Sequence, residues 1–117
     1  MMNTNDTVKA YFERLSRREA WQDLIAENFV FTSFVSPVKK IVGKEDFLVA
    51  TERFYSSIRT VEITARIVDG AKACALTCYE LSGPGGSFNC HVAEIFSVSD
   101  GSITSLDIYF DSRQFPS

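Results

Sequence analysis

One glutamate stands out because of its neighbours along the chain. Between Phe88 and Val98 the residues alternate in character, and one row of that alternation is apolar except for Glu94. Successive side chains of a strand point to opposite faces, so this row predicts a carboxyl group on the buried face of a sheet. A charged carboxylate is costly there unless it is paired or hydrogen-bonded, and a raised pKa is the other way to avoid the cost. Acids with a raised pKa gather at functional sites, which makes Glu94 the first candidate for chemistry.

Three environments for Glu94 are compatible with this pattern. The side chain can lie near a strand end or form a structural ion pair with Arg59 or Arg66. It can instead point into a partly hollow interior and act on a ligand there. It can also be exposed to solvent. Only the environment inside a hollow gives the residue a functional role.

Other familiar kinds of catalytic site are poorly represented. His91 is the only histidine, so a histidine-rich metal site is excluded, and we expect neither a metal nor a cofactor. No Gly-x-Ser-x-Gly motif accompanies it, as a nucleophile elbow requires. Cys74, Cys78 and Cys90 are an odd number without metal-ligand spacing, and all three lie in apolar stretches. We interpret them as reduced core residues of a cytoplasmic protein.

The last strand-like segment, residues 103–110, carries a second group of polar residues. Its apolar row is predicted to face inward and consists of Thr104, Leu106, Ile108 and Phe110. Asp107, Tyr109 and Asp111 form the other row, and we predict a surface or subunit-interface role for them. The apolar row shares a face with Glu94 only if the preceding turn is a three-residue loop with Gly101 in a left-handed bulge.

Three helical segments are predicted in the first half of the chain. Residues 7–15 place apolar side chains three and four positions apart, with Asn5 or Asp6 placed to cap the helix. A capping-box pattern at residues 16–19 predicts a second, short helix directly afterwards. Residues 43–57 return to helical spacing, with two acidic residues in the first turn. Helices therefore dominate the first half of the chain.

Strand patterns account for most of the remaining residues. The predicted strands cover residues 29–35, 40–42, 61–68, 73–81, 88–98 and 103–110. Short glycine-containing turns separate the last four, which indicates an antiparallel meander. Because helices come first and most of the sheet comes last, the fold class is α+β.

The composition fits one small globular domain that spans residues 1–117. Of these residues 45% are hydrophobic and 23% are charged, as in ordinary folded proteins. The net charge is −3 and the basic residues do not cluster, which argues against nucleic acid as a partner. No apolar run approaches the roughly 18 residues of a membrane span, and the amino end lacks a signal-peptide pattern. We expect no membrane partner.

The segment from Ala73 to Tyr79 is apolar on both of its faces. Such a strand needs a cover on each side, unlike a strand at a half-solvated surface. The helices supply one cover. A second copy of the chain is the simplest source of the other, so we predict a homodimer through the outer face of the sheet.

The order of these elements resembles the nuclear transport factor 2-like superfamily, in particular its SnoaL-like and ketosteroid-isomerase-like members. The stretches that carry the resemblance are residues 8–12, 41–47, 94–103 and 109–111. The resemblance implies a cone-shaped, cystatin-like fold, with three N-terminal helices packed on a strongly curved mixed, mainly antiparallel sheet. It also implies an apolar pocket in the mouth of the cone and dimers formed through the sheet.

The resemblance also implies a site. In the ketosteroid isomerase branch, a first-helix tyrosine and an acid on the penultimate strand donate hydrogen bonds to an enolate oxygen, and Tyr11 and Glu94 match them. That branch also needs an aspartate base on the first strand, where Ser33 is the nearest residue here. The epoxide-hydrolase branch uses an arginine and two acids in the pocket, whereas the inward position on the final strand here is Ile108. We expect the pocket to be lined by Trp21, Phe31, Ser33, Phe54, Tyr55, Ala75, Tyr79, Val92, Leu106, Ile108 and Phe110.

Two functions from different classes follow from these observations. The first is binding of a small, largely apolar molecule whose carbonyl or hydroxyl lies near Tyr11 and Glu94. If the protein is an enzyme, the expected reactions are cofactor-free isomerisation, cyclisation or hydration of a carbonyl-bearing substrate, or a hydrolase-type reaction. Glu94 would be the acid or base and Tyr11 a hydrogen-bond donor. The second function is a non-catalytic interaction or accessory domain whose pocket is filled by its own aromatic residues, with ten Phe available.

Overall fold

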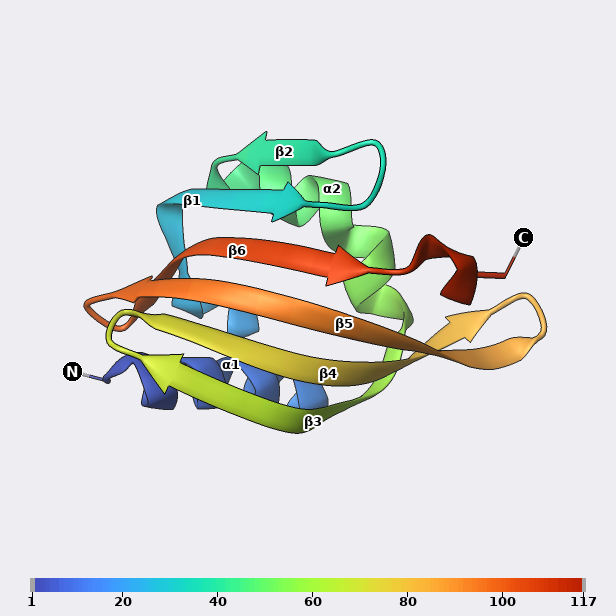
Figure 1. Cartoon of the computed structure of the whole chain (residues 1–117), viewed down its shortest axis with the longest axis horizontal. Helices are drawn as coiled ribbons and strands as arrows, with labels where there is room; N and C mark the ends of the chain where they lie inside the picture. Colours follow the sequence, from blue (N-terminus) through green and yellow to red (C-terminus); the bar gives the residue numbers. More distant parts are fainter. Residues whose placement is uncertain (1, 117) are drawn as a thin grey trace.

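Six strands and two α-helices make up most of the chain in the computed structural model, which describes residues 2–116 (Figure 1). The first half contains α1 (Thr4–Arg17), the 3-10 helix η1 (Trp21–Leu24), β1 (Ile25–Ser33), β2 (Lys39–Val42) and α2 (Lys44–Ser57). The second half contains β3 (Ile58–Asp69), β4 (Lys72–Gly83), β5 (Gly86–Ser99), β6 (Ser102–Phe110) and the 3-10 helix η2 (Ser112–Gln114). The α+β class is therefore confirmed.

The strands form one mixed sheet in the order β2-β1-β6-β5-β4-β3. β1 and β6 are parallel, and every other neighbouring pair is antiparallel. The predicted meander is present as β3 to β6. Both helices pack on one face of the sheet, α1 against β3 to β6 and α2 mainly against β1, β2 and β4 (Figure 1). This inner face holds the core, and neither α-helix of the described residues covers the opposite, outer face.

The prediction of three N-terminal helices is wrong, because the segment after α1 forms only one turn of 3-10 helix. α1 continues through Arg17, so Ser16 lies inside its last turn and cannot cap a new helix. Arg18 ends α1 in the left-handed conformation, and Ala20 also has a positive φ. These two left-handed residues leave only Trp21–Leu24 to turn before β1 begins.

The first helix begins earlier than its apolar pattern indicates. Asn3, rather than Asn5 or Asp6, is the N-cap, and its side chain accepts a hydrogen bond from the backbone N–H of Asp6 at 2.8 Å. The predicted apolar face is the buried one, since Tyr11 has no exposed surface. α2 matches its predicted range to within one residue, after Gly43 with a φ of 98°.

The β5–β6 hairpin places Ile108 on the same face as Glu94, as predicted, but with a different loop and a β-bulge. Its loop has two residues rather than three, because Ser99 pairs with Ser102 and both intervening residues have a positive φ. A β-bulge in β6 at Thr104 then shifts the register by one residue. As a result Ile108 pairs with Glu94 and shares its face, as the predicted inward row requires, while Ile103 takes the core position predicted for Thr104.

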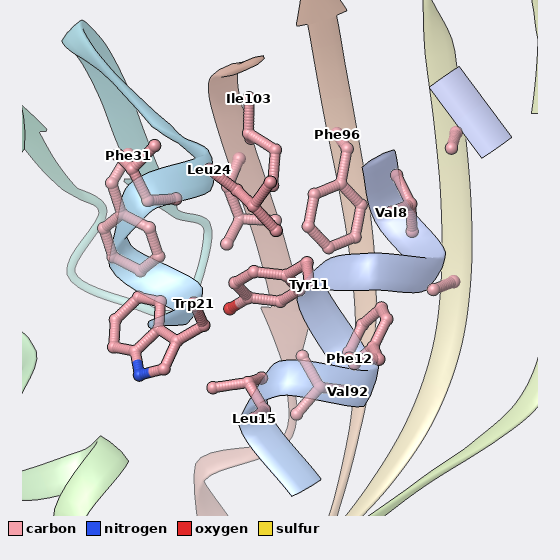
Figure 2. Packing of buried hydrophobic residues seen from close by; sticks show 14 of the residues in the cluster. Val8, Tyr11, Phe12, Leu15, Trp21, Leu24, Phe31, Val92, Phe96 and Ile103 are labelled. Carbon is pink, nitrogen blue, oxygen red and sulfur yellow. The ribbon is translucent and has the colours of Figure 1, made fainter. Parts of the chain in front are cut away.

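Aromatic rings fill the space between α1 and the sheet. The Tyr11 ring centroid lies 5.5 Å from that of Phe96 in β5, 5.0 Å from Phe12 and 6.0 Å from Trp21. Figure 2 shows the Tyr11 ring in the middle of this cluster, beside Leu24. Edge-to-face pairs of this kind add about 0.5 to 1.5 kcal/mol each to the area that they bury.

The outer face of the sheet carries apolar side chains that no helix of residues 2–116 covers. Leu76 is 45% exposed and Ile67 is 69% exposed, and the Tyr109 ring stacks on Phe34 with centroids 4.8 Å apart. Cys74 and Cys78 are also on this face and only half-buried, so the prediction that all three cysteines are core residues holds for Cys90 alone. Because β4 is apolar on both faces, an apolar neighbourhood in the sequence does not show which of its residues face the core.

Neither α-helix of residues 2–116 is long and apolar enough to cross a membrane.

Candidate functional site

A cavity of about 470 Å³ lies between α2 and the inner face of the sheet. Its size is in the range of small-molecule sites, and most of its wall is apolar. Glu94 and most of the residues predicted to line a pocket are in this wall. The predicted lining residues present are Phe31, Ser33, Phe54, Tyr55, Tyr79, Val92, Leu106, Ile108 and Phe110.

Three residues of the predicted site do not line the cavity. Ala75 is completely buried opposite Glu94 in β4. Trp21 stacks on the ring of Tyr55, with centroids 4.1 Å apart, and faces a separate depression of about 300 Å³. Tyr11 is buried behind Tyr55. All three are on the predicted side of the sheet, but alternation along a strand or helix does not show which buried residue borders a hollow.

The cavity also contains residues that the sequence analysis missed. Lys39 and Ile41 of β2 pair with Ser33 and Phe31 of β1, so strand alternation in residues 39–42 was a usable signal for them. The others are Ala50 and Thr51 of α2, Cys90 of β5 and Phe115. Phe115 follows the last strand, and no periodic pattern pointed to it.

Glu94 is buried and held by one of its two carboxyl oxygens. Its side chain is 3% exposed, and Oε2 accepts hydrogen bonds from the Thr77 hydroxyl at 2.8 Å and from the Tyr79 hydroxyl at 2.7 Å. Oε1 has no hydrogen-bond partner within residues 2–116. Every completely buried side-chain oxygen in that range does have a partner, so Oε1 is not completely buried. Oε1 is therefore the oxygen that is open to the cavity. Neither an ion pair with Arg59 or Arg66 nor a solvent-exposed position describes Glu94 in these residues.

The environment of Glu94 prepares it for proton transfer near neutral pH. Burial raises the pKa of its carboxyl group from 4.5 to about 7, while the hydrogen bonds from Tyr79 and Thr77 act in the opposite direction. Both protonation states are then populated at pH 7. A group with this pKa can give a proton to a bound molecule and take one from it.

Two further tyrosines form a pair beside the cavity. The hydroxyl oxygens of Tyr11 and Tyr55 are 2.7 Å apart, and either hydroxyl can be the donor. Burial raises the pKa of both, so both are protonated at neutral pH. When Tyr11 donates to Tyr55, the Tyr55 hydroxyl hydrogen is available to a molecule in the cavity. In that arrangement Tyr55, rather than Tyr11, presents a donor there.

Cys90 does not supply a nucleophile to the cavity. Burial raises the pKa of its thiol to about 11, so the thiol stays neutral at physiological pH. The Gln114 side-chain amide donates to its sulfur at 3.8 Å. No group of three or more His, Cys, Asp and Glu side chains within residues 2–116 is arranged to hold a metal ion.

The chain end after β6 closes one side of the cavity. Gln114 accepts a hydrogen bond from the backbone N–H of His91 at 2.7 Å and donates one to its carbonyl oxygen at 3.1 Å. Phe115 packs its ring between those of Phe88 and Phe110, with centroids 5.4 and 5.5 Å away. Asp111 caps η2 through Arg113 and lies outside the cavity wall. Phe115 thus completes the apolar wall.

Comparison with known structures finds the same fold in proteins of several descriptions. A crystal structure from Kribbella flavida DSM 17836 shares 25% identity, with a TM-score of 0.79 over 94% of this chain and 88% of that one. A protein with a ketosteroid isomerase-like fold from Catenulispora acidiphila DSM 44928 shares 19% identity, with a TM-score of 0.74 over 93% and 88%. An LEH-like epoxide hydrolase of M. tuberculosis shares 21% identity, with a TM-score of 0.74 over 92% and 82%.

No curated protein matches the chain. The SnoaL-like domain family matches residues 8–106, which include most of α1, all of α2 and all of β5, the strand of Glu94. This range covers most of the sequence and agrees with the resemblance of the element order. The chain belongs to the SnoaL-like domain family.

Proposed function

We propose that this SnoaL-like protein binds a small, largely apolar molecule in the cavity, with a carbonyl or hydroxyl oxygen of that molecule near Glu94 and Tyr55. The observation that carries the proposal is the state of the Glu94 carboxyl group. One oxygen is held by Thr77 and Tyr79, and the other is open to an apolar cavity. A fixed polar group in an apolar wall orients a ligand and selects for its oxygen atom.

The arrangement supports cofactor-free proton transfer next to a carbonyl group. Ionised Glu94 would take a proton from the carbon beside the carbonyl, and the electron pair of that C–H bond would move onto the carbonyl oxygen to form an enolate. Tyr55, backed by Tyr11, would donate a hydrogen bond to this oxygen. Protonated Glu94 would then return the proton to a different carbon. The net reaction is an isomerisation, and the same groups suit a cyclisation or hydration.

This scheme uses one acid where the ketosteroid isomerase branch uses two. Ser33 lines the cavity, but a serine hydroxyl does not accept protons at pH 7. Glu94 is the only carboxyl group among the wall residues of the described chain, so a site with an arginine and two acids is not supported either. The role of proton carrier therefore rests on Glu94 alone.

The second candidate, a non-catalytic interaction domain, is favoured by the outer face of the sheet. We propose that two copies pair through this face and cover Leu76, Ile67 and the stacked rings of Phe34 and Tyr109. Replacing Leu76 by Arg should give a folded monomer by light scattering after gel filtration. A chain that is already monomeric before the substitution contradicts the proposal. The pocket itself is hollow, so its filling by Phe side chains is not part of this candidate.

A thermal-shift screen tests the leading proposal. The purified protein is heated with a panel of steroids, aromatic polyketide-like compounds, terpenoid epoxides and fatty acids, and each hit is repeated with Glu94→Gln. A ligand at a hundred times its Kd stabilises the folded state by about 2.7 kcal/mol, which raises the Tm by several degrees. We expect a hit whose shift is smaller in Glu94→Gln.

Turnover of the hit is then measured in both proteins. Loss of turnover in a folded Glu94→Gln protein supports the proton-transfer role, and unchanged turnover rejects it. If no class of compound changes the Tm, the ligand-binding proposal fails and the non-catalytic interaction domain becomes the better-supported hypothesis.

A further inference from the structure

Four residues that are paired from strand to strand form one row across the cavity wall, with basic and hydroxyl groups at one end and an acid at the other. Lys39 in β2 pairs with Ser33 in β1, Ser33 pairs with Ile108 in β6, and Ile108 pairs with Glu94 in β5. Directly paired residues of neighbouring strands point to the same face of a sheet, and all four line the cavity. The row therefore has an ammonium group and a hydroxyl at one end, an apolar side chain in the middle and an acid at the other end.

The two polar groups at the Lys39 end have no partner in residues 2–116. Lys39 forms no ion pair there, and neither its ammonium group nor the Ser33 hydroxyl makes a hydrogen bond. The other hydroxyls of the wall are not available at this end, since Thr51 donates to a backbone carbonyl, Tyr79 donates to Glu94, and Tyr55 is the donor to the ligand oxygen at the Glu94 end in the proposed function. Ser33 and Lys39 are thus the groups left to meet a ligand at this end.

The two charged residues of the wall would fix the orientation of a ligand that has a polar group at each end. Lys39 is the only cationic side chain among the wall residues of the described chain, and Glu94 is the only acid. A ligand carboxylate beside Glu94 would disfavour the ionised form of that group by like-charge repulsion. The same carboxylate beside Lys39 gains an opposite charge and, from Ser33, a hydrogen-bond donor. An anionic group therefore fits the Lys39 end and a neutral oxygen fits the Glu94 end.

The row also indicates the length of the ligand. Lys39 and Glu94 are three strands apart, and neighbouring strands are ~4.8 Å apart, so their backbones are separated by ~14 Å along the sheet. Both side chains reach inward and shorten the gap. Between them the wall is apolar, with Ile108 in the row itself and the Phe31 ring two residues from Ser33 in β1, which suits a flat aromatic or polycyclic body.

We propose that the ligand of this cavity is an amphipathic carboxylic acid, with a carbonyl or hydroxyl oxygen bound at Glu94 and its carboxylate bound by Lys39 and Ser33 at the far end of the same row. This inference rests on the proposed function, because it names the class of molecule that the same cavity takes.

A matched pair of compounds tests it. 6-Acetyl-2-naphthoate has a ketone at one end of a bicyclic aromatic body and a carboxylate at the other, and its methyl ester lacks only the charge. The Kd of each is measured by calorimetric titration at pH 7 and low salt. The proteins are the wild type, Lys39→Gln and the control Lys40→Gln, which changes the next residue of β2, outside the cavity wall.

The proposal expects three results together. The wild type binds the acid more tightly than the ester. Lys39→Gln weakens binding of the acid about five-fold, as expected for a partly exposed charge pair, and leaves the ester unchanged. Lys40→Gln changes neither Kd. Both lysines are exposed, so both variants should keep the wild-type Tm.

Two other results overturn it in different ways. If acid and ester bind equally, or if Lys40→Gln weakens the acid as much as Lys39→Gln, no anion site exists at Lys39, and the ligand-binding function survives. If neither compound binds and the panel of uncharged compounds also gives no shift, the proposed function fails and this inference falls with it.

Discussion

Under α1 the rings of Tyr11, Phe12 and Phe96 close the space between helix and sheet, whereas under α2 the same sheet borders a cavity of about 470 Å³. The difference comes partly from the helices. α1 turns the rings of Tyr11 and Phe12 onto the sheet, whereas α2 borders the cavity with the small residues Ala50 and Thr51 beside its rings of Phe54 and Tyr55. One face of one sheet thus supports a packed half and a hollow half.

Glu94 lies at the boundary between these halves. It is two residues from Phe96 on the same face of β5, and both side chains are buried. Phe96 meets the rings of α1, while Glu94 meets two hydroxyl donors and the cavity. The comparison assigns stability to the packed half and the proposed ligand binding to the hollow half.

The largest expected effect is on the packed half. Phe96→Ala removes a completely buried ring that packs on two aromatic residues of α1, so we expect the free energy of unfolding to fall by about 3 to 5 kcal/mol. Phe110→Ala, in the cavity wall, should cost less than half as much, because its ring is only partly buried. Urea unfolding of both variants measures the difference. Equal losses in the free energy of unfolding would show that the packed half does not contribute more to stability than the cavity wall.

The next effect is a pH dependence of stability carried by Glu94. Its pKa is about 7 in the folded protein and near 4.5 in the unfolded chain, so between these values only the unfolded state releases the proton. Stability should therefore fall as the pH rises from 4.5 to 7 and then stay level, by a total on the order of 3 kcal/mol.

Glu94→Gln should remove this slope. Urea unfolding from pH 4.5 to 8 compares the variant with the wild type. The variant is expected to lie above the wild type at pH 8, because a neutral amide avoids the cost of a buried charge. A wild-type curve that rises with pH over this range would contradict the raised pKa.

A smaller effect distinguishes filling the cavity from damaging the fold. Ala50→Phe places a ring at the cavity wall from an exposed position of α2 and should change the free energy of unfolding by less than about 1 kcal/mol. The free energy by which a ligand stabilises the folded state should fall by about 2 kcal/mol or vanish, and the rise in Tm should shrink with it. Lys44→Gln, at the start of α2 and outside the wall, serves as the control. A full ligand response in Ala50→Phe would mean that the ligand binds elsewhere.

A similarly small change in stability is expected at the contact between the two halves. Tyr11→Phe keeps the ring in the packed half and removes only the hydrogen bond to Tyr55, which should cost about 1 kcal/mol. If Tyr55 donates to the substrate, Tyr55→Phe should reduce kcat more than Tyr11→Phe does. The ratio of the two kcat values is the measurement. A larger loss in Tyr11→Phe would return the donor role to Tyr11.

The sequence by itself determined which way side chains point. Alternation placed Glu94 on the inner face of β5, helical spacing placed Tyr11 on the buried face of α1, and the α+β order followed from the elements. These are local properties, because the repeat of a strand or helix depends only on neighbouring backbone geometry.

The tertiary structure decided what those side chains meet. The pairings of the strands and the approach of the helices are set by contacts between distant segments. The pairing of β4 with β5 brings Thr77 and Tyr79 to Glu94, the approach of α2 to α1 places Tyr55 in front of Tyr11, and the pairings of β2, β1, β6 and β5 put Lys39 in one row with the acid. No periodic pattern encodes such meetings, since a repeat shows the direction of a side chain and not its distance from another strand.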